Sequence, residues 1–385
     1  MNAVKKLLNI ILILFGVILI VFCADLVINK LVHTDLSQLD ETDRAALEEI
    51  CSMTELFDDK YGNDTVWTED YNLRNEPVVV TRNYGLIKGS TYAVNMTYTK
   101  NIFAQRIKMP DEYSDIPVYR LSYLYPQSFK LAKQEEAGFT DVAGTRAYAS
   151  AFDQSLVKMN GTGSLEENIV EATFKDSVES IDVPSQSDSN AFDITEENIA
   201  LMGLQYRIID DMMGADSPDK LDEFIAEYVK VREYQAEKYP EFTKTKAASE
   251  ISGGCTKHVF YSISKLIGHD ITYFNKEEAE SITFYSAYYY LCTGRYNSDI
   301  GEFLNKMGDE YAGAALCRII SENELEDNWQ TKIDGANYTS QYTILKNYSE
   351  KYCGKYADKT IEDIQRTYNY EEIIGMARAL CKEIG

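Results

Sequence analysis

The residues best suited to metal or acid–base chemistry are scarce in this sequence. It has three histidines, His33, His258 and His269, among 385 residues. Cys255 precedes His258 by three positions and His269 follows by eleven, so the three side chains could supply ligands to a metal ion. Helical spacing alone places Cys255 and His258 on neighbouring positions. We therefore expect no structural metal at this segment and no cofactor for the chain as a whole.

The sequence also lacks the motifs of common hydrolases and nucleotide-binding proteins. It contains no H-E-x-x-H, no G-x-S-x-G, no Walker loop and no EF-hand loop. The glycine pair in residues 160–163 directly precedes a predicted helix and is interpreted as a turn. Carboxylates such as Glu166, Glu167 or Glu171 could act as acid and base, but with 62 acidic residues the sequence singles out no pair.

The charge of the chain excludes another class of function. Lys plus Arg total 38 and Asp plus Glu total 62, which gives a net charge of −24. Such a chain repels nucleic acid backbones and anionic membrane surfaces, so we expect no nucleic acid partner. The hydrophobic content of 45% is that of an ordinary globular protein, and the length allows a substantial core.

The N-terminus carries a predicted membrane anchor. Residues 7–24 form an almost unbroken apolar run, preceded by Lys5 and Lys6. A helix of this length approaches the thickness of a bilayer core, and the two lysines predict a cytoplasmic N-terminus. Phe22 stands before Cys23, where lipidation needs a small residue, and the run lacks a good cleavage site. We predict a retained single-pass anchor in the cell membrane, with the main domain extracytoplasmic.

The other cysteines leave both disulfides and free thiols open. An exported chain can form disulfides, but a domain of this size does not need them, and buried thiols also pack as small apolar groups. No pairing can be read from the sequence. The six cysteines are Cys51, Cys255, Cys292, Cys317, Cys353 and Cys381.

The patterning of apolar residues predicts an α+β fold. Residues 1–30 are expected to form the cytoplasmic N-terminus and the transmembrane anchor, and residues 31–75 a helical stalk. The extracytoplasmic domain follows over 76–385. Within it, 76–155 contains short β-rich runs separated by Gly, Asn, Asp and Pro, whereas 156–385 is mainly helical.

Local signals predict where the first helices of the helical part begin. Ser164 and Glu167 form a capping box that opens one helix. Thr195 opens a second helix, whose apolar spacing ends at Gly214. Pro218 stands in the first turn of a third, where its missing N–H has no cost.

A series of short segments follows in a fixed order between residues 141 and 294. They are 141–148 (DVAGTRAY), 169–178 (IVEATFKDSV), 190–193 (NAFD), 204–209 (LQYRII), 228–232 (YVKVR), 253–258 (GGCTKH) and 287–294 (AYYYLCTG). The series resembles a group of bacterial zinc metallopeptidase-like proteins of the gluzincin type. Their pattern runs D-x-x-G-x-R, V-H-E-x-F-H, N-x-H-L-D, L-E-W-R-A-L, F-R-x-x-R, E-G-x-A-E-Y and A-Y-x-x-G. The resemblance covers about residues 140 to 320 and implies a metallopeptidase-like domain.

The same resemblance implies that the metal-binding and catalytic groups are gone. Zinc hydrolysis needs two imidazoles one helical turn apart, a carboxylate beside the first and a third protein ligand. In this alignment Glu171 takes the first ligand position, Ala172 that of the general base, Lys175 the second ligand and Gly253 the third. We expect no metal-dependent catalysis, while catalysis of another kind stays open.

Glu171 and Lys175 also stand four residues apart, in the order that favours a helical ion pair. We hypothesise that an internal cation stands where zinc would bind in the family. The alternative is that both charges face solvent on an ordinary helix.

These observations predict a membrane-anchored pseudo-metallopeptidase that binds a peptide or protein, or serves in envelope assembly. The alternatives are an active hydrolase that uses other residues, and a purely structural envelope protein. A peptide-hydrolysis assay with and without a chelator would separate the first alternative from the others. By resemblance, the remnant of the substrate cleft consists of Glu171, Ala172, Lys175, Tyr206, Arg207, Arg232 and Gly253.

Overall fold

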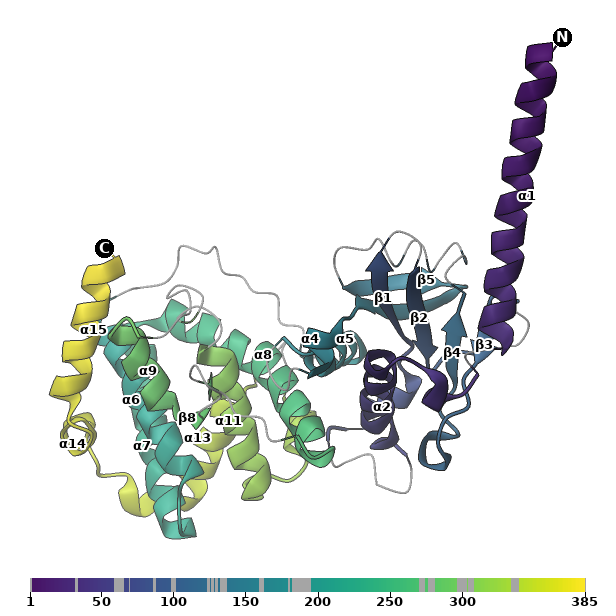
Figure 1. Cartoon of the computed structure of the whole chain (residues 1–385). Helices are drawn as coiled ribbons and strands as arrows, with labels where there is room; N and C mark the ends of the chain where they lie inside the picture. The colour runs from purple at the N-terminus through teal and green to yellow at the C-terminus, as the bar shows by residue number, and fades with distance from the viewer. Residues whose placement is uncertain are drawn as a thin grey trace. The chain divides into compact units, whose positions relative to one another are not determined.

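The computed structural model divides the chain into two compact units. The first comprises residues 1–173 with 263–270, and the second comprises 174–262 with 271–385. The chain is mostly helical, with one six-stranded sheet and one apolar helix at the N-terminus (Figure 1). The structure describes all residues except 1, 32–33, 59–65, 69, 86–87, 98–101, 123–124, 126–127, 129–130, 132–136, 159–162, 179–180, 182–194, 270–273, 276–280, 296–302, 304–307, 334–338 and 385.

The first unit is built on the six-stranded sheet, whose strand order is β3-β4-β2-β1-β6-β5. Neighbouring strands pair antiparallel except β1 and β6, which run parallel with Val79 opposite Ala149. All six strands lie within the segment 76–155 that was predicted to be β-rich. They are β1 (Val78–Gly85), β2 (Lys88–Val94), β3 (Ala104–Arg106), β4 (Val118–Leu121), β5 (Gly138–Val142) and β6 (Thr145–Ala151).

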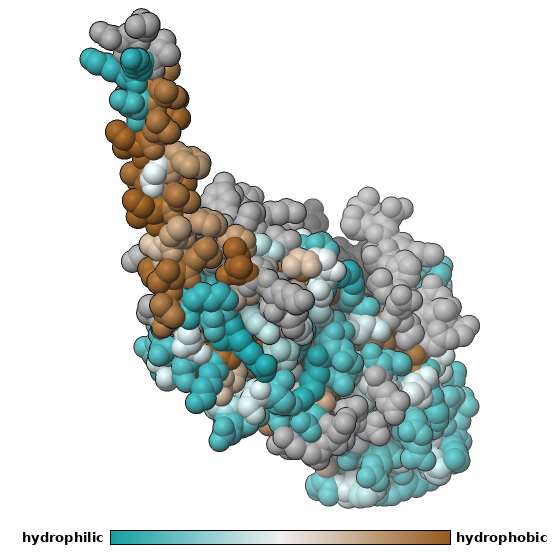
Figure 2. Space-filling view, turned by 90° about the vertical axis from the view of Figure 1, so that its right-hand side faces the viewer, coloured by the Kyte–Doolittle hydropathy of each residue, from teal (hydrophilic) through white to brown (hydrophobic). Residues whose placement is uncertain are grey.

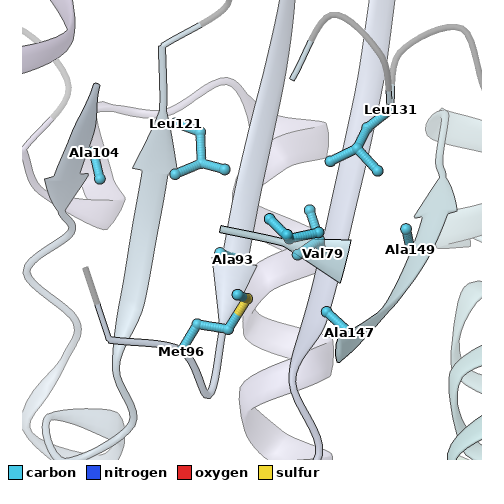
Figure 3. Packing of buried hydrophobic residues seen from close by; sticks show 9 residues of the cluster. Val79, Ala93, Met96, Ala104, Leu121, Leu131, Ala147 and Ala149 are labelled. Atoms are coloured by element: carbon cyan, nitrogen blue, oxygen red, sulfur yellow. The ribbon is translucent and has the colours of Figure 1, made fainter. Parts of the chain in front are cut away.

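One face of this sheet carries a compact apolar core. Val79 of β1, Ala93 of β2 and Leu121 of β4 lie side by side and are buried, and Ala147 and Ala149 of β6 continue the same face (Figure 3). Because successive side chains of a strand point to opposite faces, the intervening residues face the other side of the sheet.

The helix α2 (Glu41–Glu55) packs against that other side. Tyr92, which alternates with Ala93 on β2, donates a hydrogen bond of 2.8 Å to Asp43 of α2. Leu47 and Ile50 of α2 are fully buried. The segment 31–75, predicted to be a helical stalk, thus contributes the helix α2 to the first unit.

Short helical elements complete the first unit. The helix α5 begins in it and continues past Thr173 into the second unit, and the end of α8 returns to it from Ile263. The elements are η1 (Leu36–Gln38), η3 (Leu73–Asn75), η4 (Asp111–Tyr113), α4 (Gln154–Lys158), α5 (Leu165–Ser177) and the end of α8 (Pro240–Leu266).

The N-terminal helix α1 (Asn2–Leu31) is different from every other helix described. Its segment Lys5–Leu31, 27 residues, is long and apolar enough to span a membrane, and its most apolar stretch is not buried in the protein. Figure 2 shows the hydrophobic side chains gathered along this helix. A membrane anchor and a signal sequence both fit these properties.

The second unit is a bundle of helices around α6. This helix contacts α7, α9, α11 and α15, and most of its side chains are buried. The elements are α6 (Glu196–Met213), α7 (Pro218–Lys238), the main part of α8, α9 (Phe284–Cys292), α11 (Gly308–Glu322), α12 (Trp329–Lys332), α13 (Gln341–Tyr352), η7 (Gly354–Tyr356), α14 (Ile361–Thr367), α15 (Tyr370–Ile384) and the short strands β7 (Phe274–Asn275) and β8 (Ser281–Ile282).

The predicted helix starts are confirmed. The Thr195 hydroxyl accepts the N–H of Asn198 at the start of α6 (3.1 Å), and α7 begins at Pro218. At the start of α5 the Ser164 hydroxyl accepts the N–H of Glu167 (3.0 Å). The Glu167 carboxylate accepts the N–H of Gly163, one residue earlier than a capping box requires.

Two glycines allow α8 and α11 to cross in direct backbone contact. A Cβ atom at Gly254 of α8 would lie 2.7 Å from the Cα of Gly313 in α11, and one at Gly313 would lie 2.6 Å from the carbonyl oxygen of Glu250. Any larger residue would push the helices apart. This close crossing brings polar residues of α8 and α11 within reach of each other.

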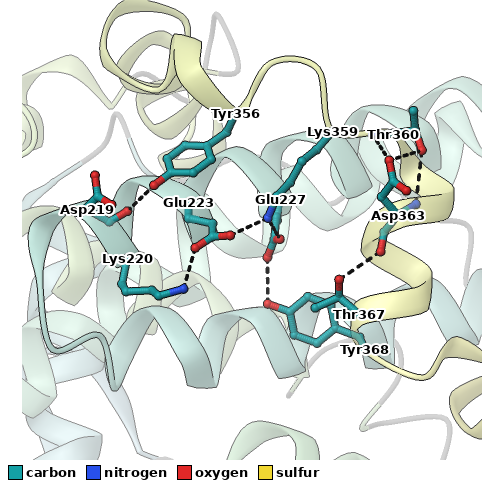
Figure 4. Close-up of polar contacts among 10 residues, drawn as sticks. All are labelled: Asp219, Lys220, Glu223, Glu227, Tyr356, Lys359, Thr360, Asp363, Thr367 and Tyr368. Carbon is teal, nitrogen blue, oxygen red and sulfur yellow. Dashed lines mark hydrogen bonds and ion pairs between the residues drawn. The ribbon is translucent and has the colours of Figure 1, made fainter.

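A polar network fastens the C-terminal segment to α7 (Figure 4). The Lys359 ammonium lies 2.6 Å from Glu223 and 2.5 Å from Glu227. The hydroxyl of Tyr368 donates to Glu227 (2.8 Å), and that of Tyr356 donates to the Asp219 carbonyl (2.8 Å). These contacts hold η7 and α14 against one side of α7.

Candidate functional site

Three of the predicted cleft residues lie around a buried set of charges in the second unit. Arg232 of α7 belongs to this set, and Tyr206 of α6 packs against Lys246, a second member. Gly253 lies one helical turn after Glu250 on α8. The four members, which we call the ionic quartet, are Arg232, Lys246, Glu250 and Asp309.

The ionic quartet pairs two cations with two anions. The Arg232 guanidinium donates to Glu250 at 2.9 Å, and the Lys246 ammonium lies 2.9 Å from Asp309 and 4.0 Å from Glu250. None of the four residues is more than 2% exposed. Paired charges of this kind are the form in which a protein interior tolerates ionised groups.

Burial and charge act against each other within the quartet. Burial raises the pKa of Glu250, with a contribution from Asp309, although Arg232 and Lys246 oppose the shift. Burial alone would lower the pKa of Arg232, but the negative charge of Glu250 reverses this effect and the pKa is raised. The guanidinium therefore stays charged, and the quartet depends on it.

Two tyrosine hydroxyls border the quartet without a hydrogen-bond partner among the described residues. They belong to Tyr206 and Tyr228, both of them fully buried. The Lys246 ammonium lies 5.3 Å from the ring centroid of Tyr206, which adds a cation–π contact.

The predicted cleft residues in this region are thus interior residues. Tyr206 and Arg232 are completely buried, and the side chain of Glu310 fills the space beside Gly253, where a Cβ atom would meet the Glu310 Cγ at 2.1 Å. A ligand at the surface cannot touch Tyr206 or Arg232 in this conformation. The reason is the packing of α6 against α7 and α11, together with the contacts of α8 with α7 and α11.

Arg207 has a different structural role. Its guanidinium donates to the carbonyl of Tyr368 (2.9 Å) and lies over the rings of Tyr285 (5.0 Å) and Tyr368 (5.7 Å). These contacts connect α6 to α9 and to the end of α14, so they stabilise the bundle and do not form a site.

The remaining predicted residues lie on α5, where the two units divide. Glu171 and Ala172 are half-buried and belong to the first unit, whereas Lys175 is exposed and belongs to the second. Glu171 lies near Tyr148 of β6, whose pKa is raised by burial and also by this carboxylate. Because the residues are divided between the units, the convergence of Glu171, Lys175 and Gly253 in one cleft stays a prediction.

The three possible metal ligands Cys255, His258 and His269 each have other surroundings. Cys255 is buried, and its sulfur accepts a hydrogen bond from the Gln341 amide (3.3 Å). His258 packs edge-on against Trp329, and burial lowers its pKa to about 4. His269 binds a glutamate in the first unit. All the cysteines are free thiols in this structure.

One group of carboxylates in the first unit is arranged as a cation site. The oxygens of Glu55, Asp58 and Asp115 lie within 4.8 Å of one another. The guanidinium of Arg74 bonds to all three, at 2.6, 2.9 and 2.6 Å. The protein thus supplies its own cation to this group.

A second cluster in the first unit has the features of an acid–base site. Glu166, in the first turn of α5, is 1% exposed. Its carboxylate accepts a hydrogen bond from the Ser264 hydroxyl and lies 2.9 Å from Nδ1 of His269. Burial, and then the charge of Glu166, raise the pKa of Glu49 on α2 to about 8. We call these four residues the acid–histidine cluster.

The acid–histidine cluster could exchange protons near neutral pH. The Glu49 carboxyl group keeps its proton until about pH 8, and His269 is partly exposed. Ser264 and His269 both bind Glu166, so the arrangement differs from a serine–histidine–acid relay. Glu166 was named among the possible acids, but nothing in the sequence connected it to Glu49 or His269.

The first unit also has a groove at its surface, between η1, α2 and the segment that follows β3. Its volume is about 660 Å³. In the part of the chain that the structure describes, the guanidinium of Arg44 makes no ion pair, although acidic residues line the same groove. The groove is lined by Asp35, Leu36, Ser37, Arg44, Glu48, Lys108, Met109, Pro110 and Asp111.

Comparison with protein-family models, with curated proteins and with solved structures yields no match. The resemblance to zinc metallopeptidases therefore stays a prediction from the sequence segments.

Proposed function

We propose that this chain is a membrane-anchored extracytoplasmic protein that recognises a peptide-like ligand with a free carboxylate. The observation that carries the proposal is the guanidinium of Arg44, which lines the groove of the first unit without an ion-pair partner among the described residues. A guanidinium binds a carboxylate through two parallel hydrogen bonds, which gives orientation as well as affinity.

The other lining residues suit a ligand with several polar groups. Lys108 provides a second cation, and Glu48 and Asp111 provide acceptors for a positively charged or amide group. Leu36 and Met109 add apolar surface. A peptide end, with its carboxylate, amides and side chains, matches this mixture better than a purely apolar or purely anionic molecule.

The membrane part of the proposal is supported by α1. Its apolar side chains are exposed along a length sufficient to cross a bilayer, and Lys5 and Lys6 precede them. In the orientation predicted from these lysines, both folded units lie outside the cytoplasm.

We infer that the metallopeptidase-like segments form a non-catalytic scaffold. Ala172 and Gly253 have no donor atom to offer a metal, and Lys175 is cationic. The ionic quartet supports the same inference, because Arg232 and Lys246 already neutralise the buried carboxylates Glu250 and Asp309.

The experiment is a binding measurement with short N-acetylated peptides, each with either a free C-terminal carboxylate or an amide. The full chain in detergent is expected to prefer the carboxylate form. Arg44→Ala should weaken binding of that form about tenfold or more, since a hydrogen bond to a charged group contributes about 1.5–3 kcal/mol. Arg366→Ala, which removes a surface arginine paired with Asp363 in α14, is the matched control. Equal affinity for the two peptide forms would contradict the proposal.

The acid–histidine cluster favours a second candidate function, hydrolysis by general acid–base chemistry. Here Glu49 would donate a proton to the leaving group and the His269–Glu166 pair would orient the attacking water. Turnover of a peptide or glycan library that is insensitive to chelators and is lost in Glu49→Gln would favour this function. If Arg44→Ala abolished binding while no turnover occurred, recognition alone would remain.

A further inference from the structure

The end of the anchor helix is fastened to the edge of the sheet. The side-chain amide of Asn29 donates to the carbonyl of Phe103 (3.1 Å), and the Lys30 ammonium donates to that of Ala104 (2.5 Å). One turn earlier, Asp25 accepts a hydrogen bond from the Ser122 hydroxyl. Together these contacts hold the end of α1 against β3 and against Ser122, which follows β4.

The contact continues into the apolar part of the helix. The ring of Phe22 packs edge-on against that of Phe103, with centroids 5.8 Å apart, and Phe103 stacks on Tyr125 at 5.1 Å. Asn29 is only 2% exposed, so the helix and the sheet enclose it. A side chain of the apolar run is thus in direct contact with an aromatic residue of the folded unit.

The position of Phe22 along the helix fixes the depth of this contact. A bilayer core about 30 Å thick takes roughly 20 helical residues. Counted from Leu7, the first residue after the two lysines, such a span ends near Leu26. Phe22 is four residues before that point, which places it about 6 Å inside the core boundary at 1.5 Å per residue. Asp25 then lies at the boundary, and Asn29 and Lys30 lie in the headgroup region.

A large apolar side chain next to this contact is mostly exposed. Ile102, the neighbour of Phe103, is 61% exposed. Among residues outside α1 it has one of the most exposed large hydrophobic side chains in the described part of the chain. Tyr125, which stacks on Phe103, is an aromatic residue with a polar tip, the type that is enriched at membrane interfaces.

We propose that the β3 edge of the first unit is seated in the membrane interface, with Ile102 inserted at the boundary between headgroups and acyl chains. The partner of this surface is the lipid bilayer, because Phe22 and Phe103 hold Ile102 at the depth where the acyl chains begin. The inference rests on membrane anchoring by α1, which is part of the proposed function, and it is independent of the ligand in the groove.

The experiment places a fluorescent probe at the proposed contact. The chain has two tryptophans, Trp67 and Trp329, and both are buried. The full-length Ile102→Trp variant is reconstituted in zwitterionic vesicles whose lipids carry bromine either near the headgroup or near the chain end. The control is Glu112→Trp, an exposed position in η4, which packs against α2.

In Ile102→Trp, lipids brominated near the headgroup are expected to quench the added emission at least twofold more than lipids brominated near the chain end. The emission of Glu112→Trp should be unchanged by either lipid. The vesicles are first washed with alkali to check that they retain the protein. If they do, equal quenching of the two variants by the brominated lipids would overturn the seating of β3 and leave the anchor intact. Loss of the protein in that wash would overturn the anchor and the seating together, whereas peptide binding is measured separately in detergent.

Discussion

The two units both bury carboxylates, but they neutralise them in different ways. In the second unit, Glu250 and Asp309 each have a cation within 2.9 Å, and all four side chains are sealed from water. In the first unit, the buried Glu166 has a serine and a partly exposed histidine as partners, and a second carboxyl group, Glu49, lies near it.

This difference separates a structural arrangement from one that can respond to its surroundings. The ionic quartet balances its charges internally and offers no atom to a ligand. The acid–histidine cluster has an excess of acid and a route to solvent through His269, so its charge depends on pH. A buried acid therefore suggests acid–base chemistry only where no neighbouring cation balances its charge.

The largest expected effect comes from removing one charge from the ionic quartet. Lys246→Met leaves Asp309 without its cation, and we expect the second unit to lose about 3–5 kcal/mol of unfolding free energy. Urea unfolding of the full chain in detergent, followed by circular dichroism, measures this loss.

The matched control is Lys220→Met, which breaks an exposed pair with Glu223 and should cost about 0–1 kcal/mol. The double variant Lys246→Met with Asp309→Leu should recover part of the loss, because both charges leave together. Equal costs for Lys246→Met and Lys220→Met would mean that the quartet is not sealed from water.

The next largest effect is expected where the first unit uses a guanidinium to hold three carboxylates. Arg74→Met should cost about 1.5–3 kcal/mol, since Glu55, Asp58 and Asp115 then repel one another. Excess calcium chloride should restore part of the thermal midpoint of the variant, because oxygen ligands at this spacing suit Ca²⁺. An equal calcium response of the unaltered chain would count against this role of Arg74.

A smaller effect, with a defined pH dependence, is expected at Glu49. The native carboxyl group keeps its proton until its pKa of about 8, whereas the unfolded chain releases it near 4.5. The native state therefore holds more protons between these values, and the unfolding free energy should fall as the pH rises from about 4.5 to about 8.

Glu49→Gln should remove this slope, and urea titrations across the range measure it. Glu48→Gln, a change at the exposed neighbouring position, should keep the slope. An unchanged slope in Glu49→Gln would show that other groups cause the pH dependence.

The smallest effect concerns the thiols, whose reactivity reports whether solvent reaches the interiors of the two units. In the native chain in detergent only Cys381 should react with a maleimide, because detergent covers the apolar segment that contains Cys23 and the other five cysteines are buried. Burial also raises the pKa of thiols such as Cys255. After unfolding without a reductant, mass spectrometry should count seven adducts. A lower count would reveal disulfides.

The local parts of the fold were predictable because their causes are local. The Thr195 cap and Pro218 act on the backbone a few residues away, so the starts of α6 and α7 could be read from the sequence. The environment of α2 could not. Whether Ile50 faces solvent on a stalk or packs beneath a sheet depends on strands far along the chain.

The candidate sites depend even more on distant contacts. The ionic quartet joins residues of α7, α8 and α11, and no sequence spacing relates Arg232 to Asp309. Tyr206, Arg232 and Gly253 were named as one region by resemblance, but apolar patterning cannot distinguish a ligand cleft from a buried ion network. Arg44 gave no signal, because an arginine on an amphipathic helix is ordinary until the groove beside it is known.

The return of α8 to the first unit has a consequence for how the protein is made. The chain is synthesised from its N-terminal end, yet Glu166 finds Ser264 and His269 only in residues 263–270. The sheet can assemble early, but the first unit cannot be completed until α6, α7 and most of α8 have been synthesised. The order of synthesis therefore differs from the order of folding, and a chain stopped after Thr173 would carry a buried acid without its partners.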